Sequence, residues 1–410
     1  MPVTVGQPTR HDGLQRLSDF VPRAGRAYAA KRNYDHGPAD RSNVSTLSPY
    51  LRHRLITETE VVAAVLEAHS FSAAEKFIQE VCWRTYWKGW LEQRPQVWTS
   101  YLDTLNQERS CLREETALAA RVDAAERGAT GIACFDSWAL ELAQTGYLHN
   151  HARMWFASIW IFTLRLPWAL GADFFYRHLL DGDPASNTLS WRWVAGLHTK
   201  GKTYLARPDN IATYTGGRFQ LGRHELADFA APLTDEPAPA RVPLPAADAV
   251  PANAKVLLLL TEEDLAPESW NIERPTIAGV AVFRGNDAVC IQSPVVCAFK
   301  AAALEDARER AMARWNVPTC EIGTAQALAA FARERNADCA ITTVVPVGYL
   351  KPEFASFSQS SAALGLPVKQ LVRRWDGLFW PHAKAGFFTL KERIPAILDT
   401  LELGPQGSLL

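Results

Sequence analysis

The residues from Gly146 to Trp193 constrain the fold more than any other part of this chain. They place polar side chains inside a strongly apolar segment, and the spacing of Asn150, Arg153 and Met154 predicts a single helical face. A buried arginine without a partner is strongly destabilising, so Arg153 needs a carboxylate beside it. Asp181, on the acidic turn that follows, is the partner that we expect.

The composition narrows the kind of protein. A chain of 410 residues suggests two or three domains. The net charge of −1 gives no overall basic field, so DNA binding would have to come from a local basic patch. Seven cysteines occur without a CxxC motif or a Cys/His cluster, which argues against a metal site, an iron–sulfur cluster or a disulfide framework.

The sequence shows no targeting or membrane signal. The opening residues lack the apolar segment of a signal peptide. The most apolar run, residues 155–171, is interrupted by Arg165 and Pro167, which favours a buried helix over a membrane span. We therefore expect a cytoplasmic protein without a membrane partner, and we expect a monomer.

Four spaced motifs in the central stretch occur together and in a fixed order. They are an HNxxRM helix at His149–Met154, a DGD turn at Asp181–Asp183, Asn187, and a W-x-W pair at Trp191–Trp193. This set resembles the flavin-binding domain of the DNA photolyase and cryptochrome superfamily, of the cyclobutane pyrimidine dimer photolyase type. The resemblance implies FAD as the cofactor, damaged DNA as the partner and an all-α flavin-binding domain.

The resemblance also implies which residues hold the flavin. Arg153 and Asp181 would form an ion pair beside the isoalloxazine ring, and Asn187 would face the flavin N5. The other cofactor-binding residues implied are Tyr28, Val44, Ser45, Thr46, Leu47, Ser48, Gly182 and Asp183.

The loop before Pro49 can be interpreted in two ways. Its residues alone predict an ordinary helix with Ser48 at the N-cap and Pro49 at the first helical position. A helix N-terminus also presents free N–H groups to a diphosphate. The family's diphosphate loop favours the second interpretation, although Val44 and Thr46 stand where the family usually has threonine and arginine.

A second helical face carries polar groups within a tryptophan stripe. Glu80, Trp83, Arg84 and Trp87 share this face, and such a stripe is usually core. The resemblance implies instead that Glu80 hydrogen-bonds a flipped dimer, Trp83 stacks on it and Arg84 holds its backbone. The other DNA-binding or lesion-binding residues implied are Arg32, Asn150, Met154, Trp193 and Arg207, the last within a basic run at residues 196–219.

Two tryptophans match the family's electron-transfer chain. Trp191 matches the proximal member and Trp168 the middle member. The usual place of the third tryptophan, within residues 111–120, has none. Trp98, Trp138 or Trp160 could replace it, and a plain aromatic core is the alternative.

The pattern of the chain changes after residue 225. We assign residues 1–27 to an N-terminal arm or a loose first helix, 28–225 to the helical domain and 226–254 to a linker rich in proline and alanine. Residues 255–402 alternate between strand and helix, with strands expected at 255–260, 279–283, 319–322, 339–344 and 368–372. This predicts a five-stranded parallel, Rossmann-like α/β domain, followed by a tail at 403–410.

The α/β domain loosely resembles the photolyase antenna domain, here placed last in the chain as a permutation. A helix is expected at 384–400, and the sequence does not identify an antenna chromophore. The activity implied is repair of cyclobutane pyrimidine dimers by an electron from light-excited reduced flavin. One alternative is a cryptochrome-like photoreceptor without repair activity, which the domain order and the missing third tryptophan favour. Another is a scaffold without flavin that uses the fold only to bind partners.

Overall fold

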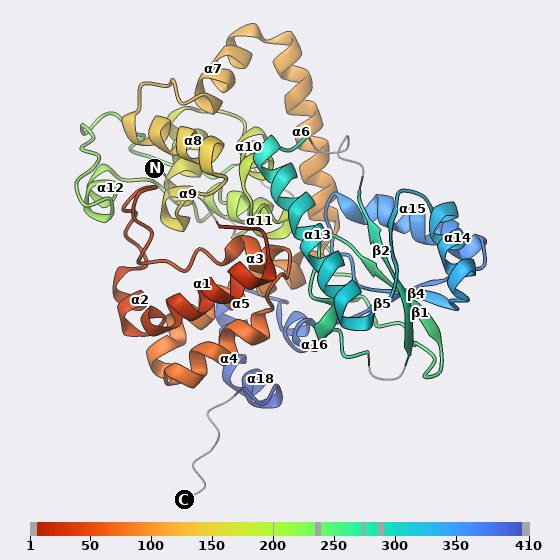
Figure 1. Ribbon diagram of the computed structural model, residues 1–410. Helices are drawn as coiled ribbons and strands as arrows, with labels where there is room; N and C mark the ends of the chain where they lie inside the picture. Colours follow the sequence, from red (N-terminus) through yellow and green to blue (C-terminus); the bar gives the residue numbers. More distant parts are fainter. Residues whose placement is uncertain (1–5, 200, 234–238, 273–274, 286–290, 404–410) are drawn as a thin grey trace, which may run out of the picture.

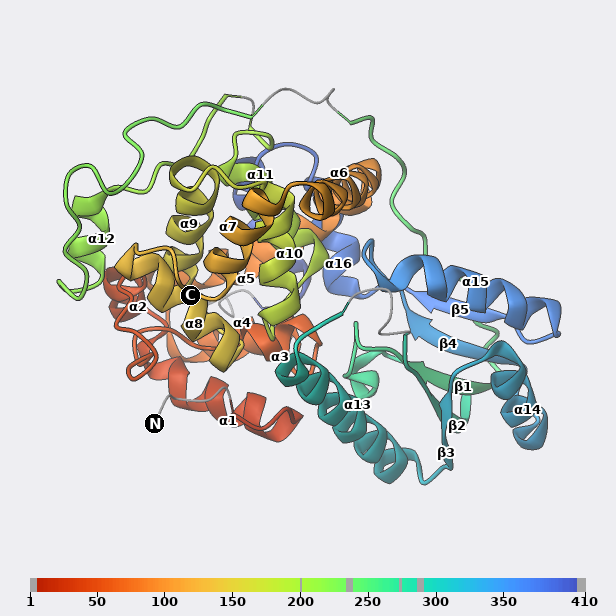
Figure 2. The ribbon, with the colours of Figure 1, turned by 90° about the horizontal axis from the view of Figure 1, so that it is seen from above.

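A computed structural model describes residues 6–199, 201–233, 239–272, 275–285 and 291–403. A large helical region comes first in the chain and an α/β region follows it (Figure 1). Seen from above, the sheet and its helices lie to one side of the helical region (Figure 2). The predicted combination of an all-α domain and a parallel α/β domain is therefore confirmed.

The helical region is built from helices of very different length. They are α1 (Arg10–Phe20), α2 (Arg26–Lys31), α3 (Ser48–Arg52), α4 (Glu58–Ala68), α5 (Phe71–Glu92), α6 (Gln96–Glu114), α7 (Thr116–Glu126), α8 (Ala133–Thr145), α9 (Asn150–Ser158), α10 (Trp168–His178), α11 (Pro184–Val194) and α12 (Pro208–Tyr214). Their starts follow from local chemistry: Thr57 and Glu60 form a reciprocal capping box at the start of α4, and Ser70 caps α5.

The α/β region contains one parallel sheet of five strands in the order β3-β2-β1-β4-β5. The strands are β1 (Lys255–Leu260), β2 (Thr276–Phe283), β3 (Thr319–Ile322), β4 (Cys339–Thr343) and β5 (Val368–Leu371). Each lies where the sequence predicts a strand. The run of leucines in β1 is explained because this central strand is buried on both faces.

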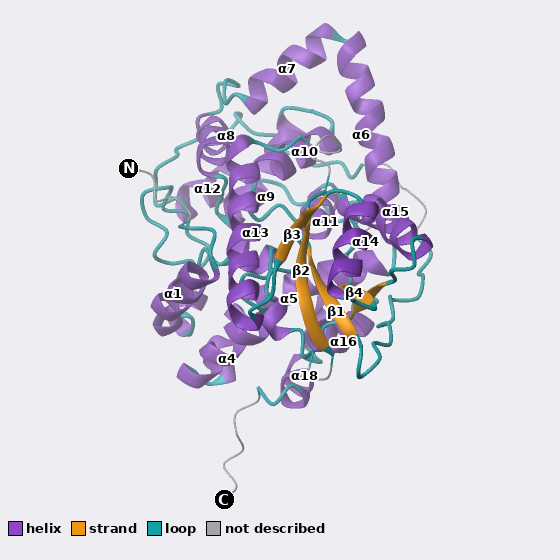
Figure 3. Cartoon of the chain, turned by 45° about the vertical axis from the view of Figure 1, so that its right-hand side comes forward, coloured by secondary structure: helices purple, strands orange, loops and turns teal. Residues whose placement is uncertain are grey.

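Helices cover both faces of the sheet (Figure 3). On one face, Leu258 and Leu260 join α13 (Pro294–Trp315) in a core that is continuous with the helical region. On the other face, Leu257 and Leu259 pack with α14 (Ala325–Arg335) and α15 (Leu350–Ala363). The two regions therefore share one hydrophobic core through one face of the sheet. Among the described residues, no helix is long and apolar enough to cross a membrane.

The N-terminal segment contains a packed helix rather than an arm or a loose helix. Residues 10–20 form α1, in which Leu17 and Phe20 are buried in the core of the helical region. Thr9 caps this helix by accepting a hydrogen bond from the Asp12 amide. The sequence is polar on average, and only tertiary contacts reveal that one face of this helix is core.

The end of the described chain also differs from prediction. The expected helix at 384–400 is two helices, α17 (Phe387–Lys391) and α18 (Ile394–Thr400), and Pro395 lies in the first turn of the second. These helices and α16 (Arg374–Phe379) pack against the helical region, beside α5 (Figure 1). Residues 374–400 thus complete the helical core rather than the sheet.

The predicted linker is extended but anchored. Its described residues, 226–233 and 239–254, contain no helix or strand. The amide of Val242 donates to the Gln93 carbonyl at 2.8 Å, and the amide of Asp248 donates to the Gln370 carbonyl at 2.9 Å. The linker therefore contacts both regions. Residues 234–238 and the tail from residue 404 lie outside the described residues.

Two adjacent carboxylates directly after β1 join the two regions. Glu263 accepts hydrogen bonds from both terminal nitrogens of Arg52, at 2.7 and 2.8 Å. Asp264 pairs with Arg373 and lies 3.5 Å from Arg54. Arg52, Arg54, Glu263 and Asp264 are buried, and buried charges need such partners.

The packing of α17 predicts opposite outcomes for two neighbouring phenylalanines. Phe387 is 3 % exposed and stacks on Trp83 of α5 with a ring-centroid distance of 3.7 Å, whereas Phe388 is 75 % exposed. We expect Phe387→Ala to lower the free energy of unfolding by about 3–5 kcal/mol, because it leaves a cavity in the core. Phe388→Ala is the matched control and should change it by less than about 0.5 kcal/mol. Equal urea midpoints for the two variants would contradict the assignment of α17 to the core.

The Asp264 ion pairs predict how stability depends on pH. Burial raises the pKa of Asp264, but Arg373 and Arg54 outweigh it and hold the pKa well below its usual range. Because the folded-state pKa lies below the unfolded value of about 3.9, this contribution is complete above that pH and is lost as the pH falls further. Asp264→Asn should therefore lower stability most at pH 7 and progressively less toward pH 2.

Urea unfolding of the wild type and of Asp264→Asn, measured from pH 7 to pH 2, tests this expectation. The two stability curves should converge at acid pH. Curves that stay parallel throughout would show that the charge of Asp264 does not stabilise the junction.

Candidate functional site: a flavin-type cavity in the helical region

The helical region encloses a cavity of about 480 Å³ between α2, the loop before α3, and helices α5, α9 and α11. Most of the predicted site residues line it. They are Tyr28, Arg32, Val44, Ser45, Thr46, Leu47, Ser48, Glu80, Trp83, Arg84, Asn150, Arg153, Met154, Asp181, Asp183, Asn187, Trp191 and Trp193. Residues expected to hold the flavin and residues expected to hold the lesion therefore share one cavity.

Three predicted site residues do not line the cavity. Trp168 is buried in the core at the start of α10, 6 % exposed. Gly182 uses its carbonyl to accept a hydrogen bond from Arg52 at 2.9 Å. Arg207 lies exposed at the start of α12, so the structure does not bring it to the cavity. For Gly182 the sequence gave no warning, because its neighbours Asp181 and Asp183 both line the cavity.

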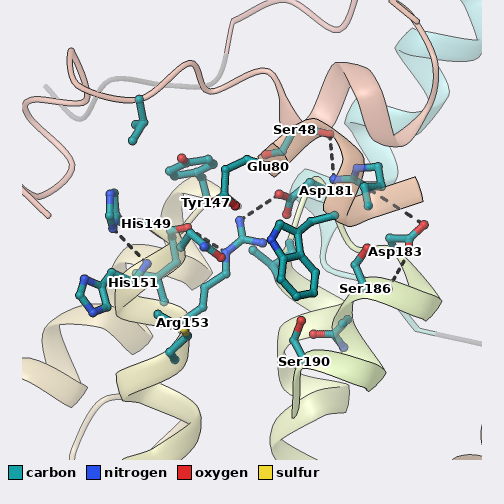
Figure 4. Close-up of a pocket in the computed structure, with 18 of the residues that line it drawn as sticks. Ser48, Glu80, Tyr147, His149, His151, Arg153, Asp181, Asp183, Ser186 and Ser190 are labelled. Atoms are coloured by element: carbon teal, nitrogen blue, oxygen red, sulfur yellow. Dashed lines mark hydrogen bonds and ion pairs between the residues drawn. The ribbon is translucent and has the colours of Figure 1, made fainter. Parts of the chain in front are cut away.

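The predicted ion pair between Arg153 and Asp181 is present. Their closest atoms are 3.0 Å apart, and Arg153 Nε donates to the Leu148 carbonyl at 2.9 Å. Figure 4 shows Arg153 reaching from α9 toward the acidic turn. Burial raises the pKa of Asp181, but the guanidinium groups of Arg153 and Arg84 outweigh it and hold the pKa below its usual range. Asp181 therefore stays ionised at neutral pH.

Asp183 has two structural tasks. One carboxylate oxygen caps α11 by accepting a hydrogen bond from the Ser186 amide at 2.7 Å. The other lies 3.3 Å from Lys88 Nζ and 3.9 Å from Arg52 Nε. Burial raises the pKa of Asp183, but these cations hold it well below its usual range.

Two consecutive residues of α11, Ser186 and Asn187, present polar groups to the cavity. Asn187 Nδ2 donates to the Ala172 carbonyl at 2.7 Å, which anchors the amide. Its oxygen Oδ1 remains to accept a hydrogen bond from a ligand. The Ser186 hydroxyl is buried and has no hydrogen-bond partner among the described residues, as expected of a site that a polar ligand completes.

The loop before α3 differs in detail from prediction. The helix begins at Ser48 and Leu47 occupies the N-cap, so Ser48 is not the capping residue. Thr46 has a φ of +51°, a left-handed conformation that turns the loop. Arg84 donates to the Ser48 carbonyl at 3.4 Å, so it lies beside this loop. A cation therefore accompanies the predicted diphosphate loop even though Thr46 replaces the family's arginine.

The groups expected to hold the lesion already have partners. Arg32, expected to face DNA, forms an ion pair with Glu80 at 2.5 Å. Burial raises the pKa of Glu80, and Arg32 opposes this shift. Trp83 stacks on Phe387 with one ring face and is still only partly buried, while it also lines the cavity.

The rings around the predicted electron-transfer residues form two groups. Trp191 contacts Trp160 edge-on, with a centroid distance of 6.3 Å. Trp168 contacts Tyr101 at 5.7 Å, and Tyr101 contacts Trp98 at 5.2 Å. Of the three suggested replacements for the distal tryptophan, Trp160 thus contacts Trp191 directly, and Trp98 is connected to Trp168 through Tyr101.

Several lining residues were not singled out from the sequence. Tyr147 lines the cavity and comes two residues before the HNxxRM motif, so its place beside the motif could have indicated it. Ser190 lies three residues after Asn187 on the same helical face, so helical spacing could have predicted that it lines the cavity. Glu58, at the start of α4, gave none because only the tertiary fold brings it near.

The residues present fit an FAD group. The cavity offers an ionised pair at Arg153 and Asp181, a backbone loop with Arg84 beside it, and the unsatisfied Ser186 hydroxyl. When bound, FAD would rest against α9 and α11 and direct its diphosphate to the loop at residues 44–48. The ion pair and the Ser186 hydroxyl suit the polar isoalloxazine ring, and the loop with Arg84 suits the anionic diphosphate.

Part of the chain is similar to known proteins. Residues 77–215 match the family described as the FAD binding domain of DNA photolyase. A deoxyribodipyrimidine photo-lyase of Streptomyces griseus is 30 % identical over 49 % of this chain and 48 % of its own length. One from Agrobacterium fabrum is 32 % identical over 46 % of this chain and 38 % of its own length.

The solved structures similar to this chain include a bacterial class III photolyase from Agrobacterium tumefaciens. It is 28 % identical, with a TM-score of 0.41 over 51 % of this chain and 43 % of that chain. The chain thus spans less than half the length of these relatives. Within its helical region, the chain is therefore similar to the FAD binding domain of DNA photolyase.

Proposed function

We propose that this protein repairs cyclobutane pyrimidine dimers in DNA under blue light, with FAD as its cofactor. The observation that carries this proposal is the single cavity lined both by Asn187, assigned to the flavin, and by Trp83, assigned to the lesion. When bound and reduced, FAD supplies one electron on excitation by light. The protein supplies the binding, the orientation and the electrostatic environment.

The residues assigned to the flavin are held in place by ion pairs and hydrogen bonds. Arg153 and Asp181 are held together at 3.0 Å, and Arg84 lies at the loop that would take the diphosphate. Asn187 is anchored through its amide nitrogen and offers Oδ1 as an acceptor. Such preorganised groups do not have to rearrange when the cofactor binds.

The lesion side combines a ring for stacking with a carboxyl for hydrogen bonding. Trp83 would stack on an extruded base, and such stacking stabilises by roughly 1–3 kcal/mol per base. Met154 and Trp193 line the cavity and add apolar surface. Arg32 would leave Glu80 for a DNA phosphate when the dimer enters.

That exchange has a consequence for the proton on Glu80. Burial raises the pKa of Glu80 and Arg32 lowers it, so loss of the Arg32 contact raises the pKa further. A higher pKa favours the protonated form of Glu80, which can donate a hydrogen bond to a carbonyl of the pyrimidine. Lesion binding and protonation of Glu80 are therefore coupled.

A second candidate is a cryptochrome-like photoreceptor that binds FAD without repairing DNA. The pairing of Glu80 with Arg32 favours it, because the carboxylate assigned to the lesion already has a partner within the cavity. The cavity and its FAD would be the same in both cases. Only the response to a dimer distinguishes them.

We expect the purified protein to be yellow and to release FAD on heating. Arg153→Met should weaken FAD retention strongly, because it leaves Asp181 as a buried charge without its nearest cation. Chromatography of the heat-released cofactor measures this. A wild-type protein that contains no flavin after gentle purification and takes up none from solution would contradict the assigned site.

We further expect blue light to restore oligonucleotides that contain a dimer when the bound FAD is fully reduced. Trp83→Leu should weaken binding of the damaged oligonucleotide by about fivefold to 100-fold, through loss of stacking. Trp90→Leu is the matched control, since Trp90 lies on the same helix and does not line the cavity. A wild type that binds reduced FAD and repairs nothing would favour the photoreceptor.

A further inference from the structure

The α/β region meets the helical region at a particular edge of its sheet. In open parallel sheets, ligands bind beyond the carboxyl ends of the strands where the strand order reverses. Here that point lies between β1 and β4. The residues that follow β1 are Glu262, Glu263 and Asp264, and they contact the segment Arg52–Arg54 of the helical region. Side chains of the same chain thus occupy the place where a ligand would otherwise bind.

Glu263 is the residue of this loop that faces the cations behind the flavin cavity. It pairs with Arg52 through both carboxylate oxygens, at 2.7 and 2.8 Å, and lies 3.4 Å from Lys88 Nζ. The Arg52, Lys88 and Glu263 side chains are 1 %, 7 % and 6 % exposed. With so little solvent to screen them, these contacts hold their positions firmly.

The same two cations hold the acidic turn of the cavity from the other side. Arg52 Nε donates to the Gly182 carbonyl at 2.9 Å. Lys88 Nζ lies 3.3 Å from Asp183, and Arg52 Nε lies 3.9 Å from it. Two cations therefore connect Glu263 of the α/β region to the turn at residues 181–183.

The acidic turn also sets the position of α11. Asp183 caps this helix through the Ser186 amide, and Asn187, Ser190 and Trp191 of the helix line the cavity. A shift of Asp183 would move the whole cavity-facing side of α11. The path from Glu263 to the flavin site thus consists of direct contacts only.

We propose that Glu263 is a positioning residue for the FAD site and acts through Arg52 and Lys88 on Asp183. The α/β region thereby shapes the cofactor cavity with a side chain that does not line it. This inference rests on the FAD site proposed above and is independent of DNA repair. The loop after β1 would therefore contribute to cofactor binding.

Loss of the Glu263 charge gives a result whose direction distinguishes positioning from simple electrostatics. Without it, Lys88 would keep Asp183 at 3.3 Å as its carboxylate partner, and Arg52 would keep Asp183 at 3.9 Å and Glu262 at 4.0 Å. Simple electrostatics predicts tighter FAD binding, because the added net positive charge attracts the anionic diphosphate. Positioning predicts weaker binding, because Asp183 is drawn away from its capping place.

The experiment titrates FAD into the full-length apoprotein and follows quenching of flavin fluorescence. Glu263→Gln should weaken FAD binding by at least about fivefold and alter the absorption bands of the bound flavin. Glu263→Asp keeps the charge with a shorter reach and should bind FAD with intermediate affinity. Glu268→Gln is the control, because Glu268 pairs with Arg10 and Arg310 and has no contact with the acidic turn.

Unchanged or tighter FAD binding by Glu263→Gln would overturn the inference, as would a wild type that binds no FAD. If circular dichroism shows that Glu263→Gln does not fold, Glu263→Asp carries the test, and an affinity equal to that of the wild type overturns it. A wild type that binds FAD tightly and repairs no dimers would refute the proposed repair activity alone.

Discussion

The structure depends on the neutralisation of the buried acidic turn at residues 181–183. Its two carboxylates lie in an apolar surrounding and require cations from three directions. Arg153 comes from α9, Lys88 from α5, and Arg52 from the end of α3. Each of these helices also forms a wall of the cavity, so the charges that stabilise the turn determine the shape of the site.

The α/β region and the last helices are integrated into this arrangement. The loop after β1 binds Arg52 and Arg54, and residues 374–400 return to α5, where Phe387 supports one face of Trp83. The helical region therefore has a core completed by segments far away in sequence. In this chain the α/β region is a structural neighbour of the cofactor site, whether or not it carries a chromophore.

The sequence predicted what depends on local patterns. The spacing of Asn150, Arg153 and Met154 placed them on one helical face, and the need to neutralise a buried arginine paired Arg153 with Asp181. The alternation of strand-like and helix-like segments along residues 255–402 predicted all five strands. It could not predict contacts between distant segments. The stacking of Phe387 on Trp83 joins residues that no local pattern connects, and the polar average of α1 concealed its buried face. Arg84 was assigned to the lesion, and only the fold shows it beside Ser48.

The central claim is that one cavity holds both the flavin ring and the damaged bases. A crystal structure of the FAD-loaded protein with a dimer-containing oligonucleotide tests it most directly. The account predicts the isoalloxazine ring between the Arg153–Asp181 pair and Asn187, with the dimer against Trp83 and Arg32 moved from Glu80 to a phosphate. A flavin outside this cavity, or a dimer bound on another surface, would contradict the account.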